Sequence, residues 1–528
     1  MIALFAAASL GFWAALPPTQ AAAMKPEWRE FRVLPYLVQP SSRGVRVTWF
    51  THDGTPGRLV LQADGGWERE YRSRPELRRE LEYSALEESQ RSVFPDMHPG
   101  PNWKHSIVVS NLPVDRVVRY RVEQGRSTFA AEFRTAPSRR LERPVRLIAF
   151  ADSETDPEGR VTRRNWAVGR QHPDSTGRPS GLTTYLVTET EGFRANLRVI
   201  GERRPDLLLL AGDIVQGGGY QRAWDEFFFH TAGPWDQTIS RVPLVPAIGN
   251  WECFGARNGG YEPAAVYASR QKYRAYFDAA PNDVRAHRNV YHRVDWGPVS
   301  ILTLDSSNGL PDNTDADTNR NIDAAKYPGR DLADINPGSP QYRWVEAQLA
   351  DARARGQIVF VQFHHIPYTS GGHSLPLTAE GSSGQAGLPM RVYQPMFRRY
   401  GVVAVMCGHN ESFEISEVDG ILYVDAGVAG DGLGFPMDDV DPRRANPWRK
   451  WVAHLDEPER WDGRRLVSGG KHYGHLEIDI LPLSGGRARI LFTPVHVFPV
   501  TDSGGDVTGF ERRPVERVFT YEVPLTSR

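Results

Sequence analysis

Five apolar runs of strand length, each ending in residues that can bind a metal, constrain this 528-residue chain more than any other feature. Residues 206–213 read DLLLLAGD, so four leucines come shortly before Asp213. An unbroken apolar run of this kind indicates a strand buried on both faces, as in a parallel sheet. Gly217–Gly219 follow and allow a sharp turn or the close approach of a ligand. Taken alone, Asp213 is equally well explained as a helix cap or a turn residue.

The other four runs end in the same way. Segments of helical character separate them, among them Ser339–Arg355, so the order is βαβα and the strands are predicted to be largely parallel. Open α/β sheets bind ligands at the carboxyl ends of their strands. Five such ends in succession therefore predict a metal site at one edge of one sheet. The runs are RLIAFAD, ending at Asp152; PLVPAIGNWE, with Asn250; QIVFVQFHH, with His364 and His365; and VVAVMCGHNE, with His409 and Glu411.

The motif order Asp, Gly-Asp, Gly-Asn-x-Glu, Val-x-x-His and Gly-His resembles the calcineurin-like metallophosphoesterases, and within them the purple acid phosphatase branch. The resemblance extends from about Arg32 to about Val495. It implies an α/β fold, the α+β sandwich of the metallophosphoesterases. It also implies a phosphoester hydrolase with two metal ions, in which a metal-bound hydroxide attacks a phosphate ester.

Residues 24–140 have a different character from those that follow. Val45, Val47 and Trp49 alternate with polar residues, and short strands with polar turns predict an all-β sandwich. The segment resembles the fibronectin-III-like domain that precedes the catalytic domain in purple acid phosphatases, so we expect a scaffold separable from the chemistry. Residues 144–500 are then the calcineurin-like domain, and residues 501–528 a C-terminal extension.

The first 23 residues are predicted to be a signal peptide. Residues 2–16 are apolar, and Ala21–Ala23 fit a small-x-small cleavage site, which predicts export to a periplasm or out of the cell. No other segment is apolar enough to span a bilayer. The net charge of −1 gives no indication of nucleic-acid binding. The expected partner is a small-molecule or exposed phosphoester, and the oligomeric state is not indicated.

The resemblance also assigns ligands to the two metals. Asp213 would bridge the metals, and Asn250, His364 and His409 would complete the second site. His364 is chosen because it matches the histidine of Val-x-x-His, which leaves His365 beside the site as a substrate contact.

His373 follows His364 by nine positions, the place of a histidine that contacts phosphate and protonates the leaving group in plant-type members. The alternative is a surface histidine with no role.

The first metal site departs from the family. Asp152 is present, but Gln216 replaces the expected tyrosine and Glu411 replaces the second histidine of Gly-His-x-His. Glu154 stands where the wider superfamily often has a ligand. An all-oxygen site of this kind prefers hard cations such as calcium, magnesium, manganese or iron to zinc. Without the tyrosine, the purple colour of the family is not expected.

Trp251 stands where the family has a histidine next to the phosphate. An indole donates one hydrogen bond but cannot transfer a proton, although it can stack on a flat group. This replacement weakens the case for fast monoester hydrolysis. The alternative function is therefore a metal-binding protein on the same fold that is catalytically weak or inactive.

Three further features leave two interpretations each. An insertion at about Thr155–Gly181, which carries Arg163 and Arg164, is either a substrate lid or a solvated loop. Residues 312–323, DNTDADTNRNID, resemble a calcium loop without its central glycine and terminal glutamate, so a solvated acidic loop is favoured. Cys253 and Cys407 form either a disulfide or two inert buried thiols.

Overall fold

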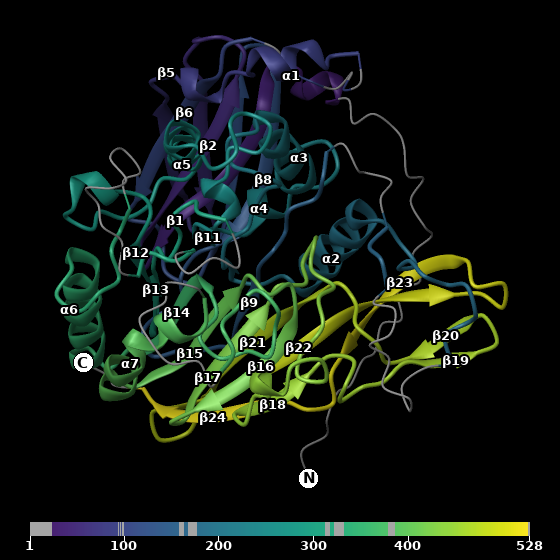
Figure 1. Cartoon of the computed structure of the whole chain (residues 1–528). Coiled ribbons are helices and arrows are strands. Elements are labelled where there is room, and N and C mark those ends of the chain that lie inside the picture. Colours follow the sequence, from purple (N-terminus) through teal and green to yellow (C-terminus); the bar gives the residue numbers. More distant parts are fainter. Residues whose placement is uncertain are drawn as a thin grey trace.

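The structure is a computed structural model that describes residues 24–92, 94, 97, 100–157, 163–166, 177–311, 317–320, 332–377 and 386–525. Two sheets packed face to face form a central sandwich, and the N-terminal strands make a second sandwich above it (Figure 1). The predicted signal peptide lies outside the described residues. Among the described helices, none is long and apolar enough to cross a membrane.

The first sheet of the central sandwich contains the parallel strands β9, β10 and β11. In β10, Leu208 and Leu210 face the helices, whereas Leu207 and Leu209 face the second sheet, so the leucine run buries both faces as expected. Antiparallel strands extend the sheet beyond β9. These strands are β9 (Val145–Phe150), β10 (Leu207–Leu210), β11 (Leu244–Pro246), β21 (Gly474–Leu483), β22 (Arg487–Thr501), β23 (Val507–Pro514) and β24 (Phe519–Pro524).

The last two strands contradict the predicted C-terminal extension. β23 and β24 both pair with β22, so the described part of 501–528 belongs to the first sheet and is not an appended extension. Their burial follows from the same apolar layer, because Val515 and Phe519 pack in the core between the two sheets.

The second sheet holds the other two predicted strand ends. Its strands β13, β14, β15 and β17 are parallel, and the remaining pairs are antiparallel. The expectation of a single sheet is therefore wrong: the five ligand-bearing strands divide between two sheets that bury their inner faces against each other. The strands are β12 (His292–Trp296), β13 (Val299–Thr303), β14 (Ile358–His365), β15 (Val402–Gly408), β16 (Phe413–Val418), β17 (Ile421–Ala426) and β18 (Arg449–Val452).

Helices cover the outer face of each sheet and complete four layers. The predicted helix α6 starts after Ser339, whose hydroxyl accepts the backbone N–H of Tyr342 at 3.1 Å. Helices α2, α3 and α5 pack on the first sheet, and α6 and α7 on the second. The helices are α2 (Glu189–Arg203), α3 (Gln221–Thr231), α4 (Thr238–Arg241), α5 (Pro263–Tyr276), α6 (Pro340–Ala354) and α7 (Gln394–Tyr400), and the small hairpin β19 (Arg460–Asp462) and β20 (Arg465–Ser468) lies to one side.

The N-terminal segment forms the predicted all-β sandwich. Val47 and Trp49 point into its core, where they meet Leu61 and Val122 from the opposite sheet. Its elements are β1 (Phe31–Ser41), β2 (Gly44–Thr51), β3 (Arg58–Ala63), β4 (Trp67–Arg72), β5 (Glu76–Leu77), the short helix α1 (Ala85–Ser89), β6 (Trp103–Ser110), β7 (Val117–Gln124) and β8 (Ser127–Arg134).

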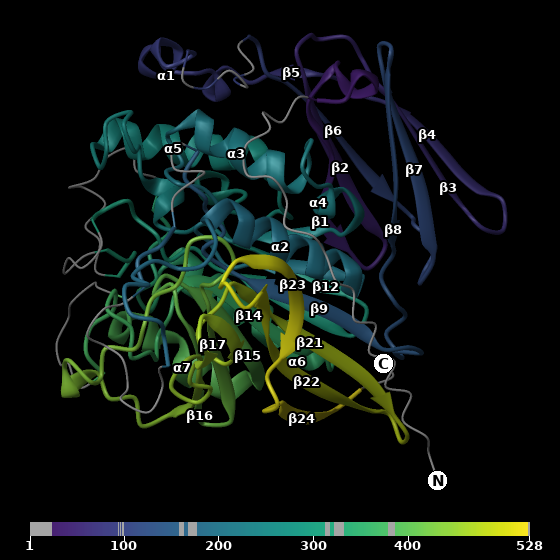
Figure 2. The ribbon, with the colours of Figure 1, turned by 90° about the vertical axis from the view of Figure 1, so that its right-hand side faces the viewer.

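This N-terminal sandwich shares both a sheet and a core with the central sandwich. Strand β1 pairs with β11 at Val38 and Leu244, which joins the two into one eleven-stranded sheet. Tyr36 is fully buried among Phe228 and Phe277, and its hydroxyl donates to the carbonyl of Tyr276 at 2.6 Å. Figure 2 shows these strands lying against the helices of the central sandwich. The segment is therefore an integral part of the core and not a separable scaffold.

We predict that Tyr36→Ala destabilises the whole chain by about 3–5 kcal/mol, because it removes a buried aromatic side chain from the shared core. Val108→Ala, in β6 of the same segment, is the control, since Val108 is 52% exposed and its loss should change stability by less than about 0.5 kcal/mol. Denaturant unfolding followed by circular dichroism measures both. A Tyr36→Ala protein whose central sandwich unfolds at the wild-type midpoint would show that the two parts are independent.

Candidate metal centre

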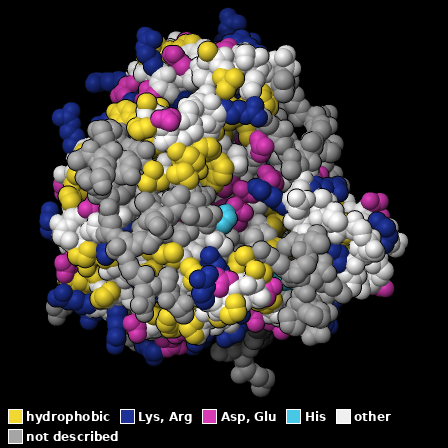
Figure 3. Space-filling view, viewed as in Figure 1, with side chains coloured by type: hydrophobic (Ala, Val, Ile, Leu, Met, Phe, Trp, Pro, Cys, Tyr) yellow, Lys and Arg dark blue, Asp and Glu magenta, His cyan; other side chains and the backbone are white. Residues whose placement is uncertain are grey.

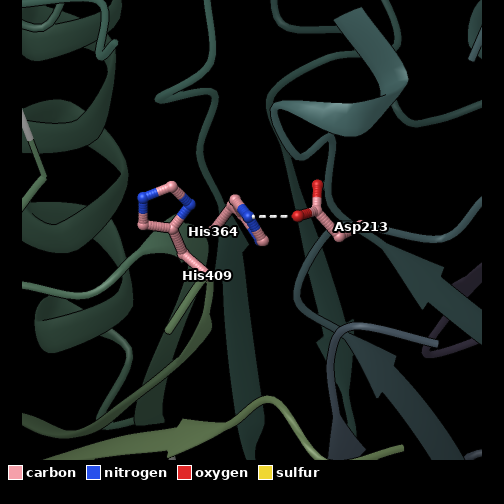
Figure 4. Close-up of side chains that lie close together, drawn as sticks. All are labelled: Asp213, His364 and His409. Atoms are coloured by element: carbon pink, nitrogen blue, oxygen red, sulfur yellow. Dashed lines mark ion pairs between the residues drawn. The ribbon is translucent and has the colours of Figure 1, made fainter. Parts of the chain in front are cut away.

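The carboxyl ends of four strands meet in one buried place, although the strands belong to two sheets. Asp152 and Asp213 follow β9 and β10, and His364 and His409 come from β14 and the end of β15. All four side chains are at most 3% exposed. His364 lies between His409 and Asp213, with its Nε2 atom 2.9 Å from Oδ2 of Asp213 (Figure 4). Figure 3 shows acidic side chains and a histidine gathered near the centre of this face.

Strained backbone aims these side chains at one another. Asp152, Asp213 and His409 have φ values of 53°, 48° and 79°, in the left-handed region that non-glycine residues rarely adopt. Such strain persists only where the surrounding structure holds it, and it is concentrated at functional sites. Gly249 and Gly427 make room, since a Cβ atom at either would collide with the carboxylate of Asp213 or Asp152.

The orientation of His364 turns one ring nitrogen toward Asp213. Its Nδ1 atom lies 3.0 Å from the carbonyl oxygen of Ala211, so Nδ1 carries the proton and donates it there. Its Nε2 atom faces Asp213 and makes no hydrogen bond with the described residues. A backbone carbonyl that fixes the tautomer in this way is typical of metal-binding histidines.

His409 and Asn250 complete the second group of predicted ligands. Nδ1 of His409 lies 3.0 Å from Oδ1 of Asn250. The backbone N–H of His409 donates to the two carboxylate oxygens of Asp152 at 3.0 and 3.2 Å, which ties the groups together. The structure thus brings together Asp213, Asn250, His364 and His409, the set predicted for the second metal.

The predicted first site is an oxygen-rich group around Asp152. Glu154 is 1% exposed, and neither of its carboxylate oxygens has a hydrogen-bond partner among the described residues. Burial raises the pKa of Glu154, and the charges of Asp213, Asp152 and Glu411 raise that pKa further. Oε1 of Gln216 is likewise buried without a hydrogen-bond partner in the described chain. Unpaired buried carboxylates are costly, so this donor set fits a hard cation.

Two residues of the site carry no role in the sequence predictions. Glu252, in the Gly-Asn-x-Glu motif, accepts the backbone N–H groups of Ile214 and Gly249 at 2.7 Å each, and so fastens the loop after β10 to the loop after β11. Lys471 is buried and donates to the carbonyl oxygens of Glu411 and Gly434, and its burial lowers its pKa to about 7. The motif could have indicated Glu252, whereas no local pattern distinguishes Lys471.

The predicted substrate residues do not all face the site. Trp251 is partly exposed, and its backbone N–H donates to Asp213 at 2.9 Å. His373 is partly exposed, and its ring centroid lies 5.8 Å from that of His409. His365, in contrast, is fully buried, and its Nδ1 lies 2.8 Å from Oγ of Ser306.

The two arginines of the insertion lie elsewhere. Arg164 pairs with Glu189 at 2.7 Å and with Asp431, so its guanidinium is neutralised within the protein. Arg163 lines a separate cavity of about 330 Å³ between α2 and β23. Substrate contact by these arginines is therefore not supported by their placement. The lid prediction itself falls largely outside the described residues, since 158–162 and 167–176 are not described.

The two other sequence alternatives are also decided. Cys253 and Cys407 are both buried and free, so the inert-thiol interpretation holds. The acidic segment is described at 317–320, where Asp317 and Asn319 are fully buried. A solvated loop is therefore the wrong description of these residues, because the chain packs them beneath the strand ends.

We predict that Glu154→Gln stabilises the metal-free protein by about 1–3 kcal/mol, because it removes one unpaired buried charge from a group of carboxylates. The matched control is Glu189→Gln, which should destabilise, since Glu189 is buried but paired with Arg164. Thermal unfolding after exhaustive chelation measures both variants. Destabilisation of the chelated protein by Glu154→Gln would mean that this carboxylate is satisfied without a cation.

Comparison with known proteins shows which families this chain resembles. A family model described as calcineurin-like phosphoesterase matches residues 187–410. Two uncharacterized proteins from two strains of Mycobacterium tuberculosis are each 26% identical over 322 residues, which is 59% of this chain and 50% of each relative. The probable inactive purple acid phosphatase 9 of Arabidopsis thaliana is 24% identical over 212 residues, 36% of this chain and 28% of that protein. The chain thus spans at most about half the length of the curated relatives it matches.

Among solved structures, the purple acid phosphatase PPD1 from seeds of yellow lupin (Lupinus luteus) superposes with a TM-score of 0.58. The two are 15% identical, and the match covers 93% of this chain and 74% of that one. Residues 187–410 are therefore similar to the calcineurin-like phosphoesterases. The overall fold is similar to that of a purple acid phosphatase, which agrees with the predicted resemblance and confirms the α/β fold preceded by an all-β segment.

Proposed function

We propose that the protein is an exported phosphoesterase that hydrolyses a phosphate ester at a pair of metal ions. The observation that carries the proposal is Glu154, a buried carboxylate that accepts no hydrogen bond from the described residues. Asp213 lies near both Glu154 and His364, and so adjoins the predicted ligands of both metals. A phosphoesterase needs two cations close together, and a carboxylate that reaches both is the means of holding them.

The chain divides the ligands by chemistry. Asp152, Asp213, Glu154, Glu411 and Gln216 would hold one ion, and a set of oxygens selects magnesium, calcium, manganese or iron. Asp213 with Asn250, His364 and His409 would hold the other, where imidazoles also admit zinc. When bound, such a pair lowers the pKa of water and neutralises the phosphoryl oxygens.

The protein's own groups orient and move protons. The hydrogen bond from His364 to the carbonyl of Ala211 fixes which ring nitrogen faces the ions. His373 lies at the partly exposed edge beside His409, and this position supports a role for its imidazole as the group that would give a proton to the leaving oxygen. Its backbone is fixed by the side chain of Asn410, whose Oδ1 accepts the His373 N–H at 2.9 Å.

Export is part of the proposal. Its support is the apolar segment at residues 2–16, followed by Ala21–Ala23. Sequencing the amino terminus of protein recovered from the periplasm or the medium tests it, and a mature chain that keeps residues 2–16 would contradict it.

We predict that Asp213→Ala loses both ions of the pair and lowers phosphoester hydrolysis at least about 1,000-fold, because one carboxylate serves both sites. Asp295→Ala, on β12, is the control and should keep metals and turnover. Metal analysis and a panel of phosphomonoesters and phosphodiesters provide the measurements. Full metal content in Asp213→Ala would overturn the ligand assignment, and an absence of turnover in the fully loaded wild type would overturn the activity.

Trp251 favours a second candidate, a metal-binding protein with weak or no turnover. The indole stands at the site in place of a proton-transferring histidine, and its ring packs edge-on against Phe254 at 5.2 Å. One curated relative is named probable inactive purple acid phosphatase 9, which is consistent with a related protein that lacks turnover.

Replacing Trp251 distinguishes the two candidates. We predict that Trp251→His raises monoester hydrolysis at least about tenfold, since general acid catalysis contributes about 100- to 10,000-fold where it operates. Trp251→Phe is the control, because it opens a similar space without adding a proton donor. Equal rates in the two variants would show that proton donation at this position does not limit the reaction.

A further inference from the structure

A second group of ligand atoms lies on the other edge of His409. Asp317, His365 and His409 each offer one atom, and these atoms all lie within 4.8 Å of one another. All three side chains are at most 2% exposed. Only His409 is shared with the group formed by Asp213 and His364, so the two groups are distinct.

His365 has a nitrogen that the protein leaves without a partner. Its Nδ1 bonds to the hydroxyl of Ser306, whereas its Nε2 is buried and makes no hydrogen bond with the described residues. The ring centroid of His365 lies 4.3 Å from that of His409. A buried imidazole nitrogen without a hydrogen-bond partner is placed to act as a metal ligand.

Asp317 supplies the negative charge of the group. Its Oδ1 atom accepts the backbone N–H of Ala386 at 2.9 Å, and its Oδ2 atom lies 3.7 Å from Nε2 of His409. The short segment that carries it is anchored, because Asn319 donates its N–H to the carbonyl of Ser306 at 2.9 Å and Thr318 forms a bridge with Ser307. The carboxylate is therefore held beside His365 by backbone bonds on both sides.

The His409 ring separates the two groups. Its Nδ1 atom faces Asn250 at 3.0 Å, and its Nε2 atom faces Asp317 and the carbonyl oxygen of His373, the latter at 3.0 Å. Each ring nitrogen of an imidazole can bind one ion, provided that the second one gives up its proton. An ion on the Nε2 side would replace the hydrogen bond to His373, and the Nε2 proton would leave to solvent.

We propose that Asp317, His365 and Nε2 of His409 form a third cation site next to the metal pair. Two imidazoles and one carboxylate favour a divalent transition metal, such as zinc, iron(II) or manganese, over calcium or magnesium. The third site extends the proposed function. It also rests on that function, because it assumes a pair of metal ions on the opposite edge of His409. The third site also gives Asp317, in the acidic segment 312–323, a role as a ligand that differs from the calcium loop which the sequence resembles.

The test counts ions in the purified full chain. After chelation and re-equilibration with zinc, elemental analysis should find three ions per wild-type chain and two in Asp317→Asn and in His365→Gln. Asp317→Asn keeps the shape of the side chain and an oxygen for the Ala386 N–H, so it is expected to fold. Circular dichroism of the chelated proteins confirms that each variant is folded.

His364→Gln is the matched control, since it changes the neighbouring residue on the same strand. It should lose an ion from the pair and keep the ion at Asp317, and anomalous scattering from crystals shows which position is empty. Asp213→Ala should likewise keep one ion at Asp317, and the count requires no substrate. Three ions without hydrolysis would therefore leave this site standing while the proposed activity fails.

Two results would overturn the third site. One is a wild-type count of two that Asp317→Asn and His365→Gln leave unchanged. The other is a lost ion that maps to the Asp213 side in these variants, which would make Asp317 and His365 positioning residues for His409.

Discussion

The burial of several carboxylates side by side at the ends of the strands is the constraint on which the rest of this structure depends. Asp152, Glu154 and Asp213 are each at most 3% exposed, and burial raises the pKa of Asp152 and of Glu154. The buried cation nearby, Lys471, donates to backbone carbonyls. Metal ions bound at this place would balance the negative charge, and folding would then be linked to metal binding.

The scaffold around this charge is stiff because both faces of its strands are buried. Strand β10 packs against helices on one side and against the second sheet on the other. Glu252 then joins the loops after β10 and β11 through backbone N–H groups. These contacts hold Asp213 at a φ of 48°, a conformation that it would not keep in an isolated loop.

The departures from the family have a common chemical direction. Gln216 and Glu411 stand where the purple acid phosphatase pattern has a tyrosine and a histidine, and Trp251 stands where it has another histidine. His365 and Asp317, in turn, add an imidazole and a carboxylate on the far edge of His409. The centre therefore keeps the frame of the calcineurin-like fold, while the residues around it differ from the purple acid phosphatase pattern.

Much of the site could be predicted from the sequence, because the apolar runs and the residues that end them are local. Asp152, Asp213, Asn250 and His409 follow their strands within four residues and His364 lies at the end of β14, and parallel strands bring such ends together. The helix after Ser339 was also predictable, since a cap and an apolar stripe are short-range signals.

The sequence could not determine how the strands divide, because a strand buried on both faces has the same unbroken apolar run in one sheet or in two. It could not show that Tyr36 packs into a core shared with α3 and α5, or that Lys471 and Asp317 reach the strand ends. Those contacts join residues that lie from 37 to 240 positions apart, and only the packing of complete layers fixes them. What the sequence by itself determined was the set of ligands in the chain; the tertiary structure decided which of them face one another, because burial and direction depend on every neighbouring element.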